Sequence, residues 1–218
     1  MKFRSKLIPG ILFVFVFVFN CSLLSFAAEP ASIQLPNPQK EGGKPLMSAL
    51  NDRMSMRTFS GEKLPMQTMS NLLWAAFGIN RPDGRRTAPS AKNWQEMDIY
   101  VATAEGVYLY DAKKNALDPV LAKDVRAMTG VQSFVKDAPV NLIFVADYAK
   151  VNESGPYGQI LVGTDAGVIS ENVYLFCASE GLATVVRAGI DRDTLAKELK
   201  LKPEQKIIIA QSVGYPKK

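Results

Sequence analysis

Hydrophobic residues follow two different repeats along the chain, and the two repeats predict different elements. Apolar residues three and four positions apart favour helices. This spacing predicts helices over residues 46–56, 65–77, 122–129, 164–179 and 191–199. The stretch 148–163, just before the longest of them, is polar and contains glycine, and we expect a loop there.

Alternating or continuous apolar runs favour strands. They predict strands over residues 96–103, 106–111, 117–120, 140–146 and 206–213, with a hairpin turn at 113–115. Helices and strands in this mixed order are typical of an α+β protein, with a mainly antiparallel sheet flanked by helices. No G-x-G-x-x-G follows a strand, so a Rossmann dinucleotide site is not supported.

The first 27 residues have the features of a secretory signal. Lys2, Arg4 and Lys6 precede an apolar run over 7–24, and Ser-Phe-Ala at 25–27 fits a small-x-small cleavage site. The alternative is a retained membrane anchor, because the run is near the shortest length that spans a bilayer. We expect cleavage, no stable membrane span after it, and export to the periplasm or the medium.

After cleavage, residues 28–45 form a Pro- and Gly-rich linker or arm, and residues 46–218 form one domain. Three of the 26 basic residues lie in the signal and none of the 21 acidic ones, so the remaining chain is nearly balanced in charge. No basic stripe interleaved with aromatic residues is present, which argues against nucleic acid as a partner.

The residue types exclude several kinds of chemistry. The chain has no histidine, and Cys177 is the one cysteine beyond the signal. Imidazole–thiolate metal sites and nucleophiles activated by histidine are therefore excluded. Redox chemistry would have to come from a bound cofactor.

Two short polar motifs are candidates for binding such a cofactor. Arg53 and Arg57 lie four apart on a stretch that we expect to be helical, with Ser55 between them, and this set suits a phosphate. The PSxxN loop (residues 89–93) offers short donors and acceptors to the edge of a flat heterocycle. Alone, each motif is more typical of an ordinary surface helix end or loop.

Two further stretches are rich in small residues or lysine. Residues 181–189, GLATVVRAG, allow a close backbone approach, or mark the passage from a helix to a strand. The chain ends in VGYPKK, where the lysines could close over a phosphate or form a frayed tail.

Taken in order, these motifs resemble the FMN-dependent nitroreductase family. The resemblance rests on R-x-S-x-R at 53–57, P-S-x-x-N at 89–93, D-A-P at 137–139, G-L-A-T at 181–184 and V-G-Y-P at 213–216. It covers about residues 49–216 and is closest to the compact branch that contains azoline-oxidising dehydrogenases. It implies a nitroreductase-like fold and an obligate homodimer with FMN at the interface.

The resemblance also implies roles for individual residues. Arg53 and Ser55 match residues that hold the FMN phosphate, and Lys217 would add a cation there. Arg57 matches a basic residue near the pyrimidine edge of the flavin, where its charge would stabilise the reduced form.

The other matches concern the flavin ring. Ala188 and Gly189 match the backbone that faces the reactive N5, and Gln132 matches a polar contact to the ring. The loop that reaches the flavin from the second subunit is matched by Pro89, Ser90, Ala91 and Asn93.

The resemblance implies an FMN oxidoreductase that passes a hydride from a reduced donor, with NAD(P)H as a candidate, to a small acceptor such as a nitroaromatic or a quinone. The alternatives are an exported flavin-binding domain without turnover and an azoline-type peptide dehydrogenase. The physiological substrate, and the electron donor outside the cytoplasm, stay open.

Overall fold

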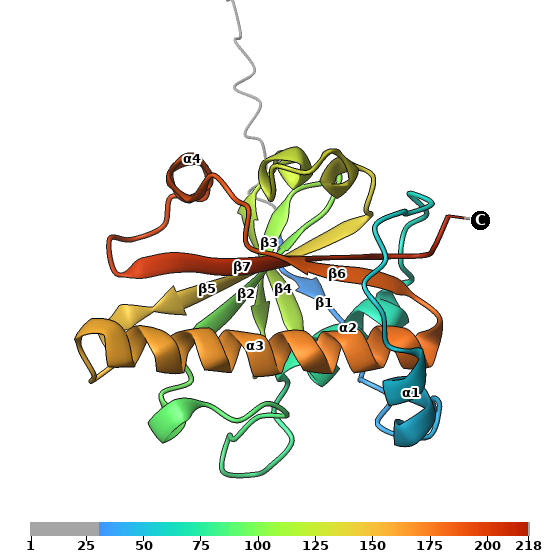
Figure 1. The fold of residues 1–218 in the computed structure, drawn as a ribbon, viewed down its shortest axis with the longest axis horizontal. Coiled ribbons are helices and arrows are strands. Elements are labelled where there is room, and N and C mark those ends of the chain that lie inside the picture. Colours follow the sequence, from blue (N-terminus) through green and yellow to red (C-terminus); the bar gives the residue numbers. More distant parts are fainter. Residues whose placement is uncertain (1–30, 218) are drawn as a thin grey trace, which may run out of the picture.

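The computed structural model describes residues 31–217, so the predicted signal over 1–27 lies outside the described residues. A seven-stranded sheet in the order β1-β4-β3-β2-β5-β7-β6 forms its centre (Figure 1). All neighbouring strands pair antiparallel, which confirms the α+β expectation. The strands are β1 Ile33–Gln34, β2 Met97–Ala102, β3 Val107–Asp111, β4 Ala116–Leu121, β5 Val140–Asp147, β6 Ala183–Arg187 and β7 Gln205–Gly214.

Helices cover both faces of this sheet. The α-helices are α1 Leu46–Asp52, α2 Met66–Phe77, α3 Gly155–Glu180 and α4 Arg192–Glu198. In Figure 1, α3 runs across one face with α2 on the same side, and α4 lies on the other. By length and composition α3 could span a membrane, and among the described residues it alone could, but here it packs on the sheet as a core helix.

The central strand β5 places alternate residues in two hydrophobic cores. Leu142 and Phe144 pack with residues of α2 and α3, whereas Ile143 and Val145 pack with residues of α4. Successive side chains of a strand point to opposite faces. Because both faces are covered, the strand reads as a continuous apolar run, and its prediction from the sequence is confirmed.

The prediction of a loop over 148–163 is wrong in its second half. Helix α3 begins at Gly155, well before the expected start at Thr164. Pro156 lies in its first turn, where a proline suits the helix geometry. Gly158 is buried there, and a Cβ on it would lie 2.5 Å from the Glu153 carbonyl oxygen. The residues that suggested a loop therefore serve a helix start.

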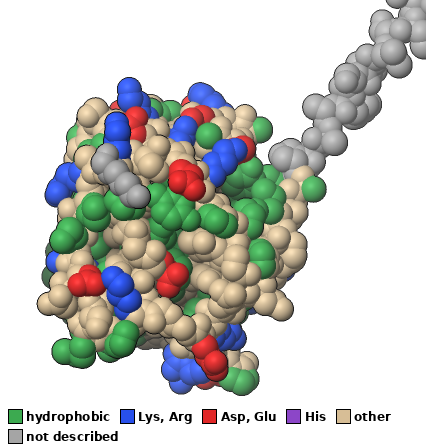
Figure 2. Space-filling model, turned by 90° about the vertical axis from the view of Figure 1, so that its right-hand side faces the viewer, with side chains coloured by type: hydrophobic (Ala, Val, Ile, Leu, Met, Phe, Trp, Pro, Cys, Tyr) green, Lys and Arg blue, Asp and Glu red, His purple; other side chains and the backbone are tan. Residues whose placement is uncertain are grey.

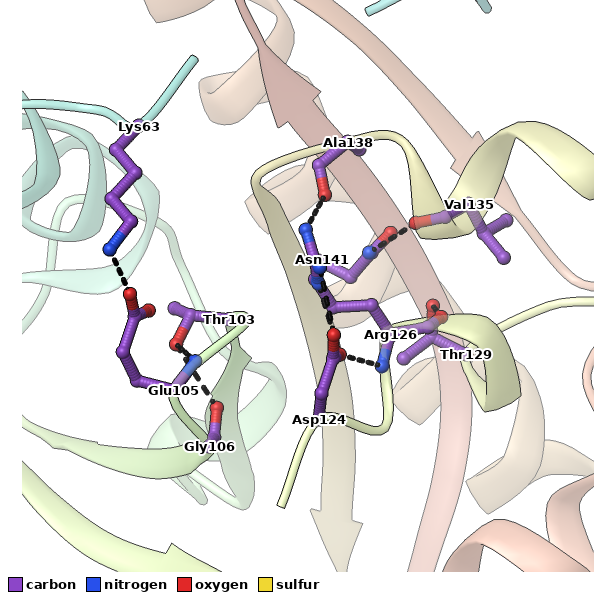
Figure 3. Close-up of polar contacts among 10 residues, drawn as sticks. All are labelled: Lys63, Thr103, Glu105, Gly106, Asp124, Arg126, Thr129, Val135, Ala138 and Asn141. Atoms are coloured by element: carbon purple, nitrogen blue, oxygen red, sulfur yellow. Dashed lines mark hydrogen bonds and ion pairs between the residues drawn. The ribbon is translucent and has the colours of Figure 1, made fainter. Parts of the chain in front are cut away.

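The predicted helix over 122–129 is also wrong. Only short 3-10 turns form, at Arg126–Met128 and Ser133–Lys136. The Arg126 guanidinium pairs with Asp124 and donates to the Ala138 carbonyl (Figure 3). These contacts hold Arg126 next to Ala138, just before β5, and a continuous helix over 122–129 does not form.

The stretch 181–189, interpreted as a close-approach segment or a helix-to-strand passage, contains the edge strand β6. At the other edge, β1 pairs with β4. The arm that follows β1 is fixed to α2, because Ser70 donates to the Pro36 carbonyl and Gln67 to the Asn37 carbonyl. The described part of the arm therefore lies against the domain.

Candidate functional site

The RxSxR segment (residues 53–57) is extended, and its prediction as helical is wrong. Helix α1 ends at Asp52, and Arg53 has φ −60° and ψ 120°. Arg53 and Ser55 both contact Tyr174, so their side chains lie on one side of the segment, and Arg57 lines a cavity with Lys217. The Met56 N–H donates to the Thr184 carbonyl at 2.9 Å, which attaches the segment to the outer edge of β6.

Tyr174 on α3 connects this segment to β6, and the sequence reasoning missed it. Its hydroxyl lies 2.8 Å from Ser55 Oγ and accepts the Val186 N–H at 3.0 Å. The Arg53 guanidinium lies over its ring, 5.4 Å from the centroid. One buried side chain therefore orients two residues of the predicted phosphate grip and the strand that leads to Ala188 and Gly189.

Gln132, predicted as a ring contact, lies beside Gly189, which is predicted to face N5. The Val131 N–H donates to the Gly189 carbonyl at 2.9 Å, and a Cβ on Gly189 would lie 3.3 Å from Gln132 Nε2. Gln132 Oε1 is buried and has no hydrogen-bond partner among the described residues. A buried acceptor without a donor is costly and is rarely left so. The Gln132 amide therefore lies just beyond β6, with its Nε2 toward Gly189 and its unpartnered Oε1 toward Gly130.

A buried cation, Arg187, is the last residue of β6. Arg187, 5% exposed, donates to the Thr129 carbonyl and to Asn141 Oδ1, and pairs with no carboxylate among residues 31–217. Asn141 donates in turn to the Val135 carbonyl (Figure 3). Burial lowers the pKa of Arg187 to about 10, so it stays charged at neutral pH. Its positive charge has no neutralising partner near the predicted ring site.

Arg57 and Lys217 line one open cavity of about 620 Å³. The Lys217 N–H donates to the Thr58 carbonyl at 3.3 Å, so the end of the chain runs beside the RxSxR segment. Other basic residues at the cavity are Arg126, which Asp124 neutralises, and Lys136. The end of the molecule that carries α1 and the C-terminus has basic side chains along its upper part and a hydrophobic band below them (Figure 2).

The PSxxN loop lies elsewhere in the same chain. The Ala91 N–H donates to Asp165 on α3, whereas Ser55 bonds Tyr174 nearer the other end of that helix. At about 1.5 Å per residue, these two anchor points are roughly 14 Å apart along the helix. Pro89, Ser90, Ala91 and Asn93 therefore do not join the other predicted site residues within one chain.

Comparison with known proteins now assigns the family. A sequence model of the Nitroreductase family matches residues 50–215, and the chain belongs to this family. A protein of Methanocaldococcus jannaschii, provisionally named a nitroreductase, is 30% identical over 181 residues, which are 78% of this chain and 90% of that protein.

Solved structures agree with this assignment. A provisionally named nitroreductase from Ralstonia eutropha JMP134 is 41% identical, with a TM-score of 0.82, over 86% of this chain and 90% of that one. The NADPH:FMN oxidoreductase of Vibrio harveyi, solved with NAD+, has a TM-score of 0.60 at 18% identity, over 79% of this chain and 69% of that one. At that identity the likeness shows the fold alone.

The residues present fit a flavin mononucleotide. Cationic and hydroxyl side chains at residues 53–57 offer charged hydrogen bonds to a phosphate. The Gln132 amide, whose Oε1 has no partner among the described residues, lies with its Nε2 beside Gly189, where the backbone can approach a flat ring closely. The family assignment supports an oxidoreductase, as the sequence predicted.

Proposed function

We propose that the protein is an FMN-dependent oxidoreductase that transfers a hydride from a reduced donor, NAD(P)H in the first instance, to a small acceptor such as a nitroaromatic or a quinone. One observation carries the proposal. The RxSxR segment is attached to β6 by Met56 and Tyr174, and Gly189, two residues beyond that strand, lies beside the Gln132 amide, whose Oε1 has no partner among the described residues. The residues that we propose for the phosphate and those that we propose for the ring thus lie along β6 and the residues that follow it.

Each residue at this site has a physical task in the proposal. Arg53 and Ser55 bind the phosphate, and Lys217 adds charge from the end of the chain. Arg57 would place a positive charge near the pyrimidine edge of the ring, and the Gln132 amide would contact the ring. When bound, FMN supplies the hydride chemistry at its N5, which explains how a chain without histidine catalyses a redox reaction.

The site is incomplete in one chain, and we propose that a homodimer completes it, as is typical of the family. The PSxxN loop lies toward the first half of α3, and the RxSxR segment lies toward its second half. A two-fold axis through the middle of α3 would place the loop of one copy near the RxSxR segment of the other.

The surface of α3 supports this arrangement. Gly163 and Gly167 have open space where a Cβ would be, and Gly167 lies near the middle of the helix. Small residues let two helices approach closely. Six of the nine large apolar side chains exposed among the described residues lie near one or the other end of α3. Tyr157 and Ile160 lie near its start, and Leu46, Met47, Leu50 and Met54 lie in and just after α1, which packs near its end.

We also propose that the protein acts outside the cytoplasm, because residues 1–27 have the pattern of a cleaved signal. NAD(P)H is a cytoplasmic reductant, so an exported enzyme would need a second route for electrons. The assay below therefore includes a chemical reductant beside the nicotinamide.

The test is a visible spectrum of the purified mature chain, residues 28–218, loaded with FMN. Flavin bands that bleach with NADPH or dithionite, and return when a nitroaromatic is added, would support turnover. A protein that retains no FMN would refute the proposal. A protein that retains FMN but never passes electrons to any acceptor would favour the binding domain without turnover.

A further inference from the structure

Two buried carboxyl groups lie beneath the PSxxN loop. Glu96 stands just before β2 and is 0% exposed, and Asp165 on α3 is 5% exposed. Among residues 31–217, neither carboxyl forms an ion pair with a lysine or an arginine. Burying one unpaired carboxylate is costly, and burying two that bond consecutive residues of one loop, Ser90 and Ala91, is more so.

These two carboxyls fix consecutive residues of the loop. Asp165 Oδ2 accepts the Ala91 N–H at 2.8 Å. Ser90 Oγ donates to Glu96 Oε2 at 3.0 Å and accepts the Gln95 N–H at 2.9 Å. The loop is therefore anchored to α3 by one acid and to the start of β2 by the other.

The loop backbone needs such anchors. Lys92, Asn93 and Gln95 have φ of 51°, 56° and 48°, in the left-handed region that residues other than glycine seldom adopt. Each such residue costs free energy and persists only where surrounding contacts hold it. The bonds to Ser90 and Ala91 flank this strained stretch, so losing them would let it relax.

One atom in the pair has no partner. Glu96 Oε1 is buried and makes no hydrogen bond among the described residues. Burial, and then the neighbouring charge of Asp165, raise the pKa of Glu96. A proton on Glu96 would relieve the repulsion and turn the orphaned oxygen into a donor toward Asp165.

We propose that Glu96 and Asp165 share a single proton, and that the protonated pair acts as a positioning device which holds Ser90 and Ala91 in the shape used by the flavin site. Loss of the proton at high pH places two negative charges together under the loop and releases it. The role toward FMN rests on the proposed function, whereas the shared proton is a property of the chain alone.

Other charged groups around the pair do not neutralise it. Lys150 lies 3.5 Å from the Gln95 carbonyl, and its nearest acids are Asp98 and Asp147. On the loop itself, the Lys92 ammonium pairs with Glu153, which lies two residues before the start of α3.

Tyr148 also faces the pair. Burial, followed by the charge of Glu96, raises the pKa of the Tyr148 phenol, so it stays neutral through the range of interest. The pair itself is then the group that titrates.

The first experiment needs no flavin. Urea unfolding of the mature protein is followed from pH 5 to pH 9 for the wild type and for Glu96→Gln, with the exposed Glu62→Gln as the matched control. The folded state binds a proton that the unfolded chain releases above about pH 4.3. The folding equilibrium constant should therefore fall as pH rises, by up to about tenfold per pH unit, until the folded pair also loses its proton.

Glu96→Gln should lose this component of the pH dependence, because its amide donates to Asp165 at every pH, whereas Glu62→Gln should keep it. The same slope in Glu96→Gln and the wild type would overturn the shared proton. If Glu96→Gln does not fold, Asp165→Asn decides the question. Its amide can donate to Glu96 and still accept the Ala91 N–H, so it should also lose the component, and an unchanged slope would again overturn the proposal.

The second experiment tests positioning. Across the pH at which the unfolding experiment shows that the folded pair loses its proton, FMN affinity of the wild type should weaken more than that of Glu96→Gln. Equal pH dependence of affinity in the two proteins would overturn the positioning role. If no FMN binds at all, the proposed function fails, and the unfolding experiment still decides whether the proton is shared.

Discussion

The hydroxyl of Tyr174 gives the sharpest test of how the phosphate grip is held. Replacing it by Tyr174→Phe removes the bonds to Ser55 Oγ and to the Val186 N–H but leaves the ring beneath Arg53. A neutral hydrogen bond contributes a net 0.5–1.5 kcal/mol, so losing two should cost about 2 kcal/mol of unfolding free energy. For a domain of this size, that lowers Tm by about 4–8 °C.

The assay is a thermal melt of the mature protein without FMN, paired with a fluorescence titration of FMN. Ser55→Ala removes one of the two bonds, so its Tm should fall about half as far. Glu62→Gln, which changes an exposed side chain without a side-chain hydrogen bond among residues 31–217, is the control and should leave Tm unchanged. FMN affinity of Tyr174→Phe should fall by less than about tenfold, because no phosphate contact is removed. A Tm within about 1 °C of the control would refute the bridging role.

Four other outcomes follow from the structure. Arg53→Ala should raise the Kd for FMN about 10- to 150-fold, the value of a charged hydrogen bond, and an unchanged Kd would remove Arg53 from the site. Arg187→Met should lower the midpoint potential of bound FMN by on the order of 30 mV in a dye-coupled titration, because a buried positive charge is lost; no shift would contradict its proximity to the ring. Burial raises the pKa of the Cys177 thiol, so native protein at pH 8 should resist Ellman's reagent until urea unfolds it, and fast labelling would contradict its burial. Leu72→Ala should cost about 2–5 kcal/mol in urea unfolding, since Leu72 is 0% exposed, and a loss below about 1 kcal/mol would contradict its place in the core.

The sequence predicted most of the sheet and helix α2, because their apolar patterns are strong. The runs that form β5 and β7 are long and hydrophobic. Such a run is typical of a strand whose two faces are both covered. The start of α3 was missed because glycine and proline usually indicate a loop. In the fold, packing against the sheet outweighs that local preference.

The RxSxR segment carried a signal that was misread. Its apolar residues, Met54 and Met56, alternate with polar ones, which is the two-residue repeat of an extended chain rather than a helical repeat. The spacing of four between the arginines is compatible with both, and the preceding helix favoured the wrong interpretation.

The residues that support the site were beyond the reach of local patterns. Tyr174 and Ser55 are 119 positions apart, and Asp165 and Ala91 are 74 apart. Such pairings exist only once the chain has folded. The prediction of the motif residues rests on family resemblance, because a flavin site is defined by a few side chains whose spacing carries little information by itself.

The attachment of the RxSxR segment to β6 has a consequence for handling the protein. An outer strand whose N–H and C=O groups are unsatisfied can recruit other chains. Here the RxSxR segment covers that edge. An anion that binds to the segment would stabilise it in this position. Recombinant expression in cells short of riboflavin should therefore give more inclusion bodies than expression in supplemented medium, so vitamin supply would set the soluble yield.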